Sequence, residues 1–225
     1  MGGATAASAG AGTGPNWAGH PPASADILAT LDPEFESHCA LIVVDVQNDF
    51  ADPGGSLFVT GGDRVAELVG TLIPRAAAQE ALVVCTQDWH PEVTPHFRDQ
   101  GGPWPRHCVQ GSWGAELHPS LPQPAQVIRK GMGDQDGYSA FSALRLGSGR
   151  VEPTPLRELL TSRGITDVFL AGLALDVCVR ATALDSVAAG FATHLLQELT
   201  AAVNLDPKDG ERALAEMAER GVQLI

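Results

Sequence analysis

Uninterrupted apolar runs recur along the chain after residue 39, and segments with a helical spacing of apolar positions lie between them. The run at 40–46 is rich in β-branched residues and shows no alternation of polar and apolar positions, which is typical of a strand covered on both faces. The same pattern predicts further strands at 81–85, 125–129, 167–170, 191–196 and 222–225. Helices are predicted between several of them, at 63–79, 155–163, 178–189 and 208–220.

Strands that alternate with helices predict an α/β fold, because parallel strands need crossover connections that cover the sheet. We therefore expect one domain over 26–225, with a doubly wound, mainly parallel sheet and helices on both faces. Residues 1–25 are rich in Ala, Gly, Ser and Pro and are expected to form a flexible tail, with no secretory signal in them. In such sheets, ligands bind beyond the carboxyl ends of the strands.

Charge and cysteine content exclude several classes of protein. The formal net charge of −13 argues against a nucleic-acid or anionic-membrane partner. No apolar segment approaches the length needed to cross a bilayer. The cysteines lack the paired spacing of a metal site or the density of a disulfide framework, so we expect free thiols and a cytoplasmic location. They are Cys39, Cys85, Cys108 and Cys178.

Three chemically useful residues follow predicted strands. Asp45 closes the first strand, Lys130 follows 125–129, and Cys178 lies where the strand at 167–170 gives way to a helix. Backbone N–H groups at a helix start favour a thiolate. If the three converge, the ammonium can pair with the carboxylate and stabilise the thiolate, and the carboxylate can accept and return the thiol proton. Otherwise Cys178 is a buried structural thiol and Lys130 forms an ordinary ion pair.

The stretch from 87 to 124 has little regular periodicity and is rich in Pro, Gly and Trp, and long loops of this kind are usually functional or disordered. It contains Asp88, His90, His96 and His107, residue types that suit zinc, iron or manganese. Spacing alone leaves a second interpretation open, in which these are solvated loop histidines. Four other histidines are expected to be structural or solvated, namely His20, His38, His118 and His194.

Five motifs together resemble the nicotinamidases, a family of isochorismatase-like cysteine hydrolases. They occur in the family's order between about residues 39 and 205, at 43–50, 87–91, 104–111, 129–131 and 172–180. The resemblance implies that Cys178 is the nucleophile, Asp45 the acid and base, and Lys130 their charge partner. It also implies an oxyanion hole made by the backbone N–H groups of Ala174 and Cys178, and a cis peptide bond between Leu173 and Ala174.

The resemblance further implies one divalent metal ion, zinc in the first instance with iron and manganese as alternatives. Its ligands would be Asp88, His90, His96 and His107. Phe50 and Trp104 match aromatic residues that sandwich the substrate ring, although ordinary packing would also explain them. Ala174, Tyr138 and Ser139 match further pocket positions. Leu175 departs from the family's usual threonine, which puts substrate preference and rate in question more than reaction class.

The function implied is the hydrolysis of nicotinamide to nicotinate and ammonia, through a cysteine thioester, in NAD salvage. The partner expected is a small molecule, and a homo-oligomer is the base-rate expectation. One alternative is another amidase or an isochorismatase-type hydrolase of the same fold. The other is a non-catalytic binding protein whose metal only secures the long loop.

Overall fold

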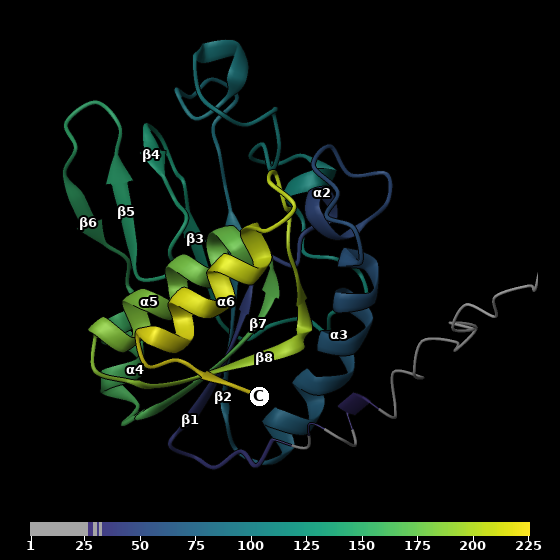
Figure 1. Ribbon diagram of the computed structural model, residues 1–225, viewed down its shortest axis with the longest axis vertical. Coiled ribbons are helices and arrows are strands. Elements are labelled where there is room, and N and C mark those ends of the chain that lie inside the picture. Colours follow the sequence, from purple (N-terminus) through teal and green to yellow (C-terminus); the bar gives the residue numbers. More distant parts are fainter. Residues whose placement is uncertain (1–26, 29–30, 32) are drawn as a thin grey trace, which may run out of the picture.

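The computed structural model describes residues 27–28, 31 and 33–225, so the tail predicted at 1–25 lies outside the described residues. A six-stranded sheet in the order β3-β2-β1-β7-β8-β9 forms the centre of the molecule (Figure 1). Every neighbouring pair is parallel. The strands are β1 (Cys39–Val44), β2 (Leu82–Asp88), β3 (Val127–Lys130), β7 (Asp167–Leu173), β8 (Ala192–Ala201) and β9 (Gln223–Leu224). The six strands predicted from the apolar runs are confirmed.

Helices cover both faces of this sheet, as the doubly wound prediction requires. They are α3 (Gly62–Ala78), α4 (Leu156–Ser162), α5 (Arg180–Ala188) and α6 (Asp209–Glu219). Alternate residues of a strand point to opposite faces. Accordingly, Leu41 and Val43 of β1 pack with the apolar side of α3. Ile42 and Val44 pack in the second core, which α4, α5 and α6 cover. No helix in the described part of the chain is long and apolar enough to cross a membrane.

Two regions differ from the prediction. No helix was predicted directly after β1, but the chain forms a short one there, α2 (Asn48–Ala51). Between β3 and α4 the chain forms a three-stranded antiparallel sheet that the apolar pattern did not predict. Its strands are β4 (Gln135–Asp136), β5 (Ser142–Arg145) and β6 (Val151–Pro153). This small sheet stands beside the carboxyl ends of the central strands (Figure 1).

A close approach between β1 and β7 draws the functional segments together. Gly172 has a φ of +117°, and a Cβ at this position would lie 2.1 Å from the Val44 carbonyl oxygen. Only glycine fits such a conformation and contact. After β7 the chain enters a π-helix, η3 (Leu175–Val179), which leads directly into α5. The end of β1 and the segment that carries Cys178 are therefore adjacent.

The long loop after β2 is anchored rather than free. Single β-bridges join His90 to Val109 and Phe97 to Trp104. Its only helical turns in the described structure are η1 (Arg98–Gln100) and η2 (Trp113–Ala115). The Asp49 carboxylate in α2 accepts a hydrogen bond from the Cys108 backbone N–H at 2.7 Å, which fastens the loop directly after His107. These contacts hold the loop histidines over the carboxyl edge of the sheet.

Candidate active site

Four functional side chains meet at the carboxyl edge of the sheet. Asp45 directly follows β1, whereas Asp88 and Lys130 end β2 and β3 and are paired in register. Cys178 lies in η3, which follows β7. Because β3, β2, β1 and β7 are consecutive in the sheet, these side chains converge. The structure thus brings together the three residues on which the sequence-based hypothesis of a catalytic cysteine depends.

Lys130 lies at the centre of this group, and its side chain is fully buried. Its Nζ is 2.6 Å from Asp45 Oδ2, forms a second ion pair with Asp88 Oδ1, and lies 3.6 Å from Cys178 Sγ. Burial alone would lower the pKa of Lys130, but the carboxylates of Asp45 and Asp88 outweigh it and raise that pKa well above its usual value. Lys130 therefore carries a permanent positive charge between two carboxyl groups.

The environment of Cys178 favours the protonated thiol. Burial raises the pKa of Cys178 well above its usual value, the ammonium of Lys130 opposes the shift, and the carboxylates reinforce it. This direction is opposite to the one expected from a helix start, because Cys178 lies inside the buried π-helix and faces two carboxyl groups. Burial also raises the pKa of Asp45, against the pull of Lys130. A carboxylate oxygen of Asp45 lies within 4.8 Å of Cys178 Sγ, so the thiol proton is close to a group that can accept it.

Alkylation of Cys178 by iodoacetamide should therefore be slow at neutral pH. In chelator-treated protein, where no metal cation contributes to the local field, we expect a rate at pH 7 at least about tenfold below that of a free cysteine. The rate should rise as the pH passes above 9, because only the thiolate reacts. Peptide mass spectrometry over a pH series measures this. A rate that is already maximal below pH 7 would show that the thiolate is the resting form.

Asp45 is held in place by Thr86, which the sequence analysis did not single out. The Thr86 hydroxyl donates to Asp45 Oδ1 at 2.6 Å and accepts from the Asp45 backbone N–H at 3.0 Å. Asp45 itself has a left-handed backbone, with a φ of 47°. Thr86 could have been predicted from the sequence, because it lies two residues before Asp88 in β2 and so points to the same face of the strand.

The three histidines of the loop form a compact cluster. One ligand nitrogen from each of His90, His96 and His107 lies within 4.8 Å of the others, and all three residues are buried. In each ring Nδ1 is bonded to an acceptor. The acceptor of His90 is the Gly131 carbonyl at 3.1 Å, that of His96 is Asp136 Oδ1 at 2.5 Å, and that of His107 is the Pro105 carbonyl at 2.7 Å. An Nδ1–H donor leaves Nε2 with a free lone pair. The cluster therefore presents Nε2 atoms toward one point.

Asp88 joins this cluster to the cysteine site. Its Oδ2 lies 3.6 Å from His90 Nε2 and 3.8 Å from His107 Nε2, while its Oδ1 contacts Lys130. Burial alone would raise the pKa of Asp88, but Lys130 and the two imidazoles hold it well below its usual range. Desolvation lowers the pKa of His90, and its buried Nε2 has no hydrogen-bond partner among the described residues. A neutral imidazole with an unsatisfied nitrogen beside a carboxylate fits a divalent metal ion.

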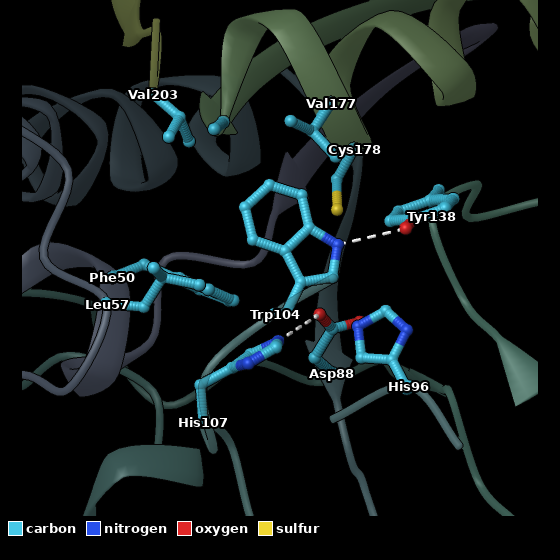
Figure 2. A pocket seen from close by; sticks show the side chains of 11 residues that line it. Phe50, Leu57, Asp88, His96, Trp104, His107, Tyr138, Val177, Cys178 and Val203 are labelled. Atoms are coloured by element: carbon cyan, nitrogen blue, oxygen red, sulfur yellow. Dashed lines mark hydrogen bonds and ion pairs between the residues drawn. The ribbon is translucent and has the colours of Figure 1, made fainter. Parts of the chain in front are cut away.

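An apolar pocket lies between the two groups (Figure 2). Its lining residues are Phe50, Leu57, Asp88, His96, Trp104, His107, Tyr138, Ala174, Val177, Cys178 and Val203. The indole of Trp104 lies across it, and its Nε1–H donates to the Tyr138 hydroxyl at 2.9 Å. Burial raises the pKa of Tyr138 to about 12, so the hydroxyl remains neutral. The polar atoms in the pocket are thus confined to the cysteine and histidine groups and the Trp104–Tyr138 pair.

The turn before the nucleophile has the conformation expected from the sequence. The Leu173–Ala174 peptide bond is cis, which confirms that prediction. Ala174 and Cys178 both line the pocket, whereas the donor role of their backbone N–H groups stays a prediction. Leu175, the departure from the family pattern, packs in the core on the α5 side and is not a lining residue. Its effect on the substrate is therefore indirect.

Sequence reasoning missed three lining residues, Leu57, Val177 and Val203. Val203 is positioned by Asp176, whose carboxylate accepts the backbone N–H groups of Val203 and Asn204 at 2.9 and 2.8 Å. Nothing in the local sequence signals this contact between segments 27 residues apart. Ser139, in contrast, was expected in the pocket, but its hydroxyl accepts the Phe141 N–H at 3.1 Å and it does not line the pocket.

Comparison with known proteins places this geometry in a family. Residues 39–225 match the isochorismatase domain. The chain is 42% identical over 191 residues to the nicotinamidase/pyrazinamidase of Mycobacterium tuberculosis, an alignment that covers 83% of this chain and 97% of that protein. The nicotinamidase of Escherichia coli is 36% identical, over 82% of this chain and 93% of its own.

Solved structures agree with the sequence relatives. The pyrazinamidase of Pyrococcus horikoshii in complex with zinc superposes with a TM-score of 0.74 at 43% identity, covering 86% of this chain and 99% of that one. A protein from L. infantum in complex with nicotinate gives a TM-score of 0.77 at 42% identity, over 86% and 95% of the two chains. Because the family match spans residues 39–225 and the relatives align over most of the chain, this chain belongs to the isochorismatase family.

Proposed function

We propose that the protein hydrolyses nicotinamide to nicotinate and ammonia, a reaction of NAD salvage, through a thioester on Cys178. The observation that carries the proposal is the buried contact of Cys178 with Lys130 and Asp45 beside the three-histidine cluster. Relatives named as nicotinamidases, and a structural neighbour solved with nicotinate, support the choice of substrate.

The first half of the reaction is acyl transfer to the thiol. Cys178 Sγ forms a bond to the carboxamide carbon while its proton passes to Asp45. This proton transfer makes the sulfur nucleophilic without requiring a thiolate in the resting enzyme. The carbonyl electron pair moves onto oxygen, where the N–H groups of Ala174 and Cys178 are proposed to stabilise the anion. When the anion collapses, the C–N bond breaks and Asp45 returns the proton to the leaving nitrogen, so that ammonia departs.

The second half regenerates the thiol. Water adds to the thioester carbon as Asp45 accepts one of its protons, and collapse then breaks the C–S bond. The sulfur takes that proton back from Asp45, and the carboxylic acid product loses its own proton to solvent and leaves as nicotinate. Lys130 remains charged throughout, because its two carboxylate partners raise its pKa well above the usual value. Its role is to offset the negative charge that shifts between sulfur and Asp45.

The proposed metal ligands are His90, His96, His107 and Asp88, whose donor set of three imidazoles and one carboxylate suits zinc, iron or manganese. Zinc is our first proposal, supported by the zinc complex of the Pyrococcus horikoshii relative. When bound, the ion supplies a Lewis acid that can hold the pyridine nitrogen of the substrate. The neutral His90 and the ionised Asp88 are what this chain contributes to that site, together with the imidazoles of His96 and His107.

The pocket favours a flat aromatic amide over the other hydrolase substrates of this fold. Phe50 and Trp104 both line it, and none of its lining residues in the described part of the chain is a lysine or arginine that could pair with a substrate carrying several carboxylates. The buried ion group of Lys130 also argues against a non-catalytic binding protein, since a metal that only secured the loop would not require it. A cytoplasmic location is proposed because all four cysteines are buried free thiols. A homo-oligomer stays a prediction.

The test is product formation from nicotinamide by reduced, zinc-loaded protein. We expect nicotinate and ammonia in equal amounts, with activity lost after chelation and restored by one equivalent of zinc. Benzamide, which has the same shape but no ring nitrogen, should be a poorer substrate with a higher KM. No product from zinc-loaded protein would refute the nicotinamidase assignment, and equal activity on benzamide would refute a role for the ring nitrogen.

A further inference from the structure

One of the three Nδ1 contacts in the histidine cluster differs in kind from the other two. His90 and His107 donate to backbone carbonyls, whereas His96 is bonded to the side chain of Asp136 at 2.5 Å. Asp136 belongs to β4 of the small antiparallel sheet and lies 40 residues from His96 along the chain. The negative charge on the acceptor makes this bond stronger than a bond to a neutral carbonyl.

The Asp136–His96 contact is well shielded from solvent. The side chains of His96 and Asp136 are 3% and 17% exposed. Within the described residues the Asp136 carboxylate has no other side-chain partner, and no arginine or lysine forms an ion pair with it. The carboxylate is therefore committed to His96, unlike neighbouring acidic groups that bind arginine at the surface.

The backbone around Asp136 is suited to hold the carboxylate still. Asp136 pairs with Leu144 across the β4–β5 ladder. In the next pair along, Arg145 binds both Asp134 and Glu152, at 2.6 and 2.9 Å. The small sheet, which has no part in the cysteine group, thus provides a fixed position for one carboxylate oxygen beside the histidine cluster.

We infer that Asp136 is a positioning residue of the metal site, an inference that rests on the proposed function. Its carboxylate accepts the Nδ1 proton of His96, fixes the tautomer in which Nε2 carries the free lone pair, and orients that nitrogen toward His90 and His107. A carboxylate behind a ligating imidazole also makes the imidazole a better electron donor. The consequence is tighter metal binding at a site where the other histidines rely on neutral acceptors.

Zinc affinity measured by competition with a chelating dye tests this without an activity assay. Asp136→Ala should weaken zinc binding by about 10–100-fold. Asp136→Asn keeps the shape and an oxygen acceptor but not the charge, so its loss should be smaller. The matched control is Asp134→Asn, which removes an equal charge two residues before Asp136. The Asp134 side chain is half-exposed and binds Arg145, so this change should leave zinc affinity unchanged.

A second readout separates tautomer control from general support of the loop. In chelated protein, the ¹⁵N spectrum of His96 should show a protonated Nδ1 and a free Nε2 in the wild type and in Asp134→Asn, and a tautomer mixture in Asp136→Ala. Thermal unfolding of the chelated variants reports whether they fold. If Asp136→Ala does not, Asp136→Asn carries the test.

The outcomes separate the two proposals. Zinc affinity and tautomer in both Asp136 variants equal to the wild type would overturn the inference and leave the proposed function intact. A wild type that binds no zinc at the histidines would overturn the metal site itself, and the inference with it. Weakened binding together with an altered His96 tautomer is the result that the structure predicts.

Discussion

Replacing Cys178 with alanine should reduce ammonia release from nicotinamide by at least about 10⁴-fold. The thiol is the only group in the described pocket that can form an acyl intermediate next to both a proton acceptor and a fixed positive charge. Asp45 and Lys130 remain in the variant, but with no sulfur between them and the substrate they have nothing to activate except water. The variant should still bind zinc, since Cys178 is outside the histidine cluster.

Cys39→Ala is the matched control for this variant. Cys39 is also a buried free thiol, but it begins β1, at the opposite end of the strand from Asp45. Its loss should leave most of the activity. Substantial turnover by folded Cys178→Ala would mean that the chemistry proceeds without a thioester, for example by direct attack of water on the amide.

Replacing Lys130 with methionine should abolish activity and also destabilise the fold, by about 3–5 kcal/mol. Removing the ammonium leaves Asp45 and Asp88 buried together with no counter-ion, and a like-charged pair out of water is strongly unfavourable. For a domain of this size, the melting temperature should fall by roughly 10 °C. Differential scanning calorimetry on chelated protein measures it.

The pH dependence of this destabilisation has a definite sign. In the wild type the pKa of Asp88 is held below its usual range. Its ionisation therefore stabilises the fold at any pH above the unfolded pKa, and this stability is lost as the pH falls through the folded pKa. In Lys130→Met the buried carboxyls have raised pKa values, so protonation relieves the repulsion as the pH falls. The gap in melting temperature between the two proteins should therefore narrow from pH 8 to pH 5.

Lys208 supplies the control, because Lys130 and Lys208 are the two lysines of the chain. Lys208 is exposed just before α6, so Lys208→Met changes the net charge equally without uncovering a buried carboxylate. It should leave activity and melting temperature close to the wild type. A Lys130→Met protein as stable as Lys208→Met at pH 8 would contradict the buried ion group described here.

Much of the fold was predictable because a strand buried on both faces requires an uninterrupted run of apolar residues. The run at 40–46 has no polar position until Asp45, and it forms a central strand with α3 on one side and α5 on the other. Charged residues at the ends of such runs were predictable as site residues for the same reason: Asp45 and Lys130 would be costly to bury unless they met a partner.

Contacts between distant segments were not predictable. The strands β4 and β6 are two and three residues long and mostly polar, so no periodicity reveals them, and with them the contact of Asp136 with His96 was missed. Nor did the sequence reveal the carboxyl groups that raise the pKa of Cys178. Its position after a strand suggested a helix start, whereas the carboxyl groups packed against it come from β1 and β2, some 130 and 90 residues earlier in the chain.

The proposed mechanism requires a thioester between Cys178 and the substrate. Its most direct test is to quench turnover of nicotinamide in acid and to analyse the Cys178 peptide by mass spectrometry, with hydroxylamine added in a parallel reaction. We predict a nicotinoyl adduct on this peptide, absent from Cys178→Ala, and formation of the hydroxamate with hydroxylamine. Steady release of ammonia with neither an adduct nor a hydroxamate would contradict the thioester mechanism and favour direct attack by water.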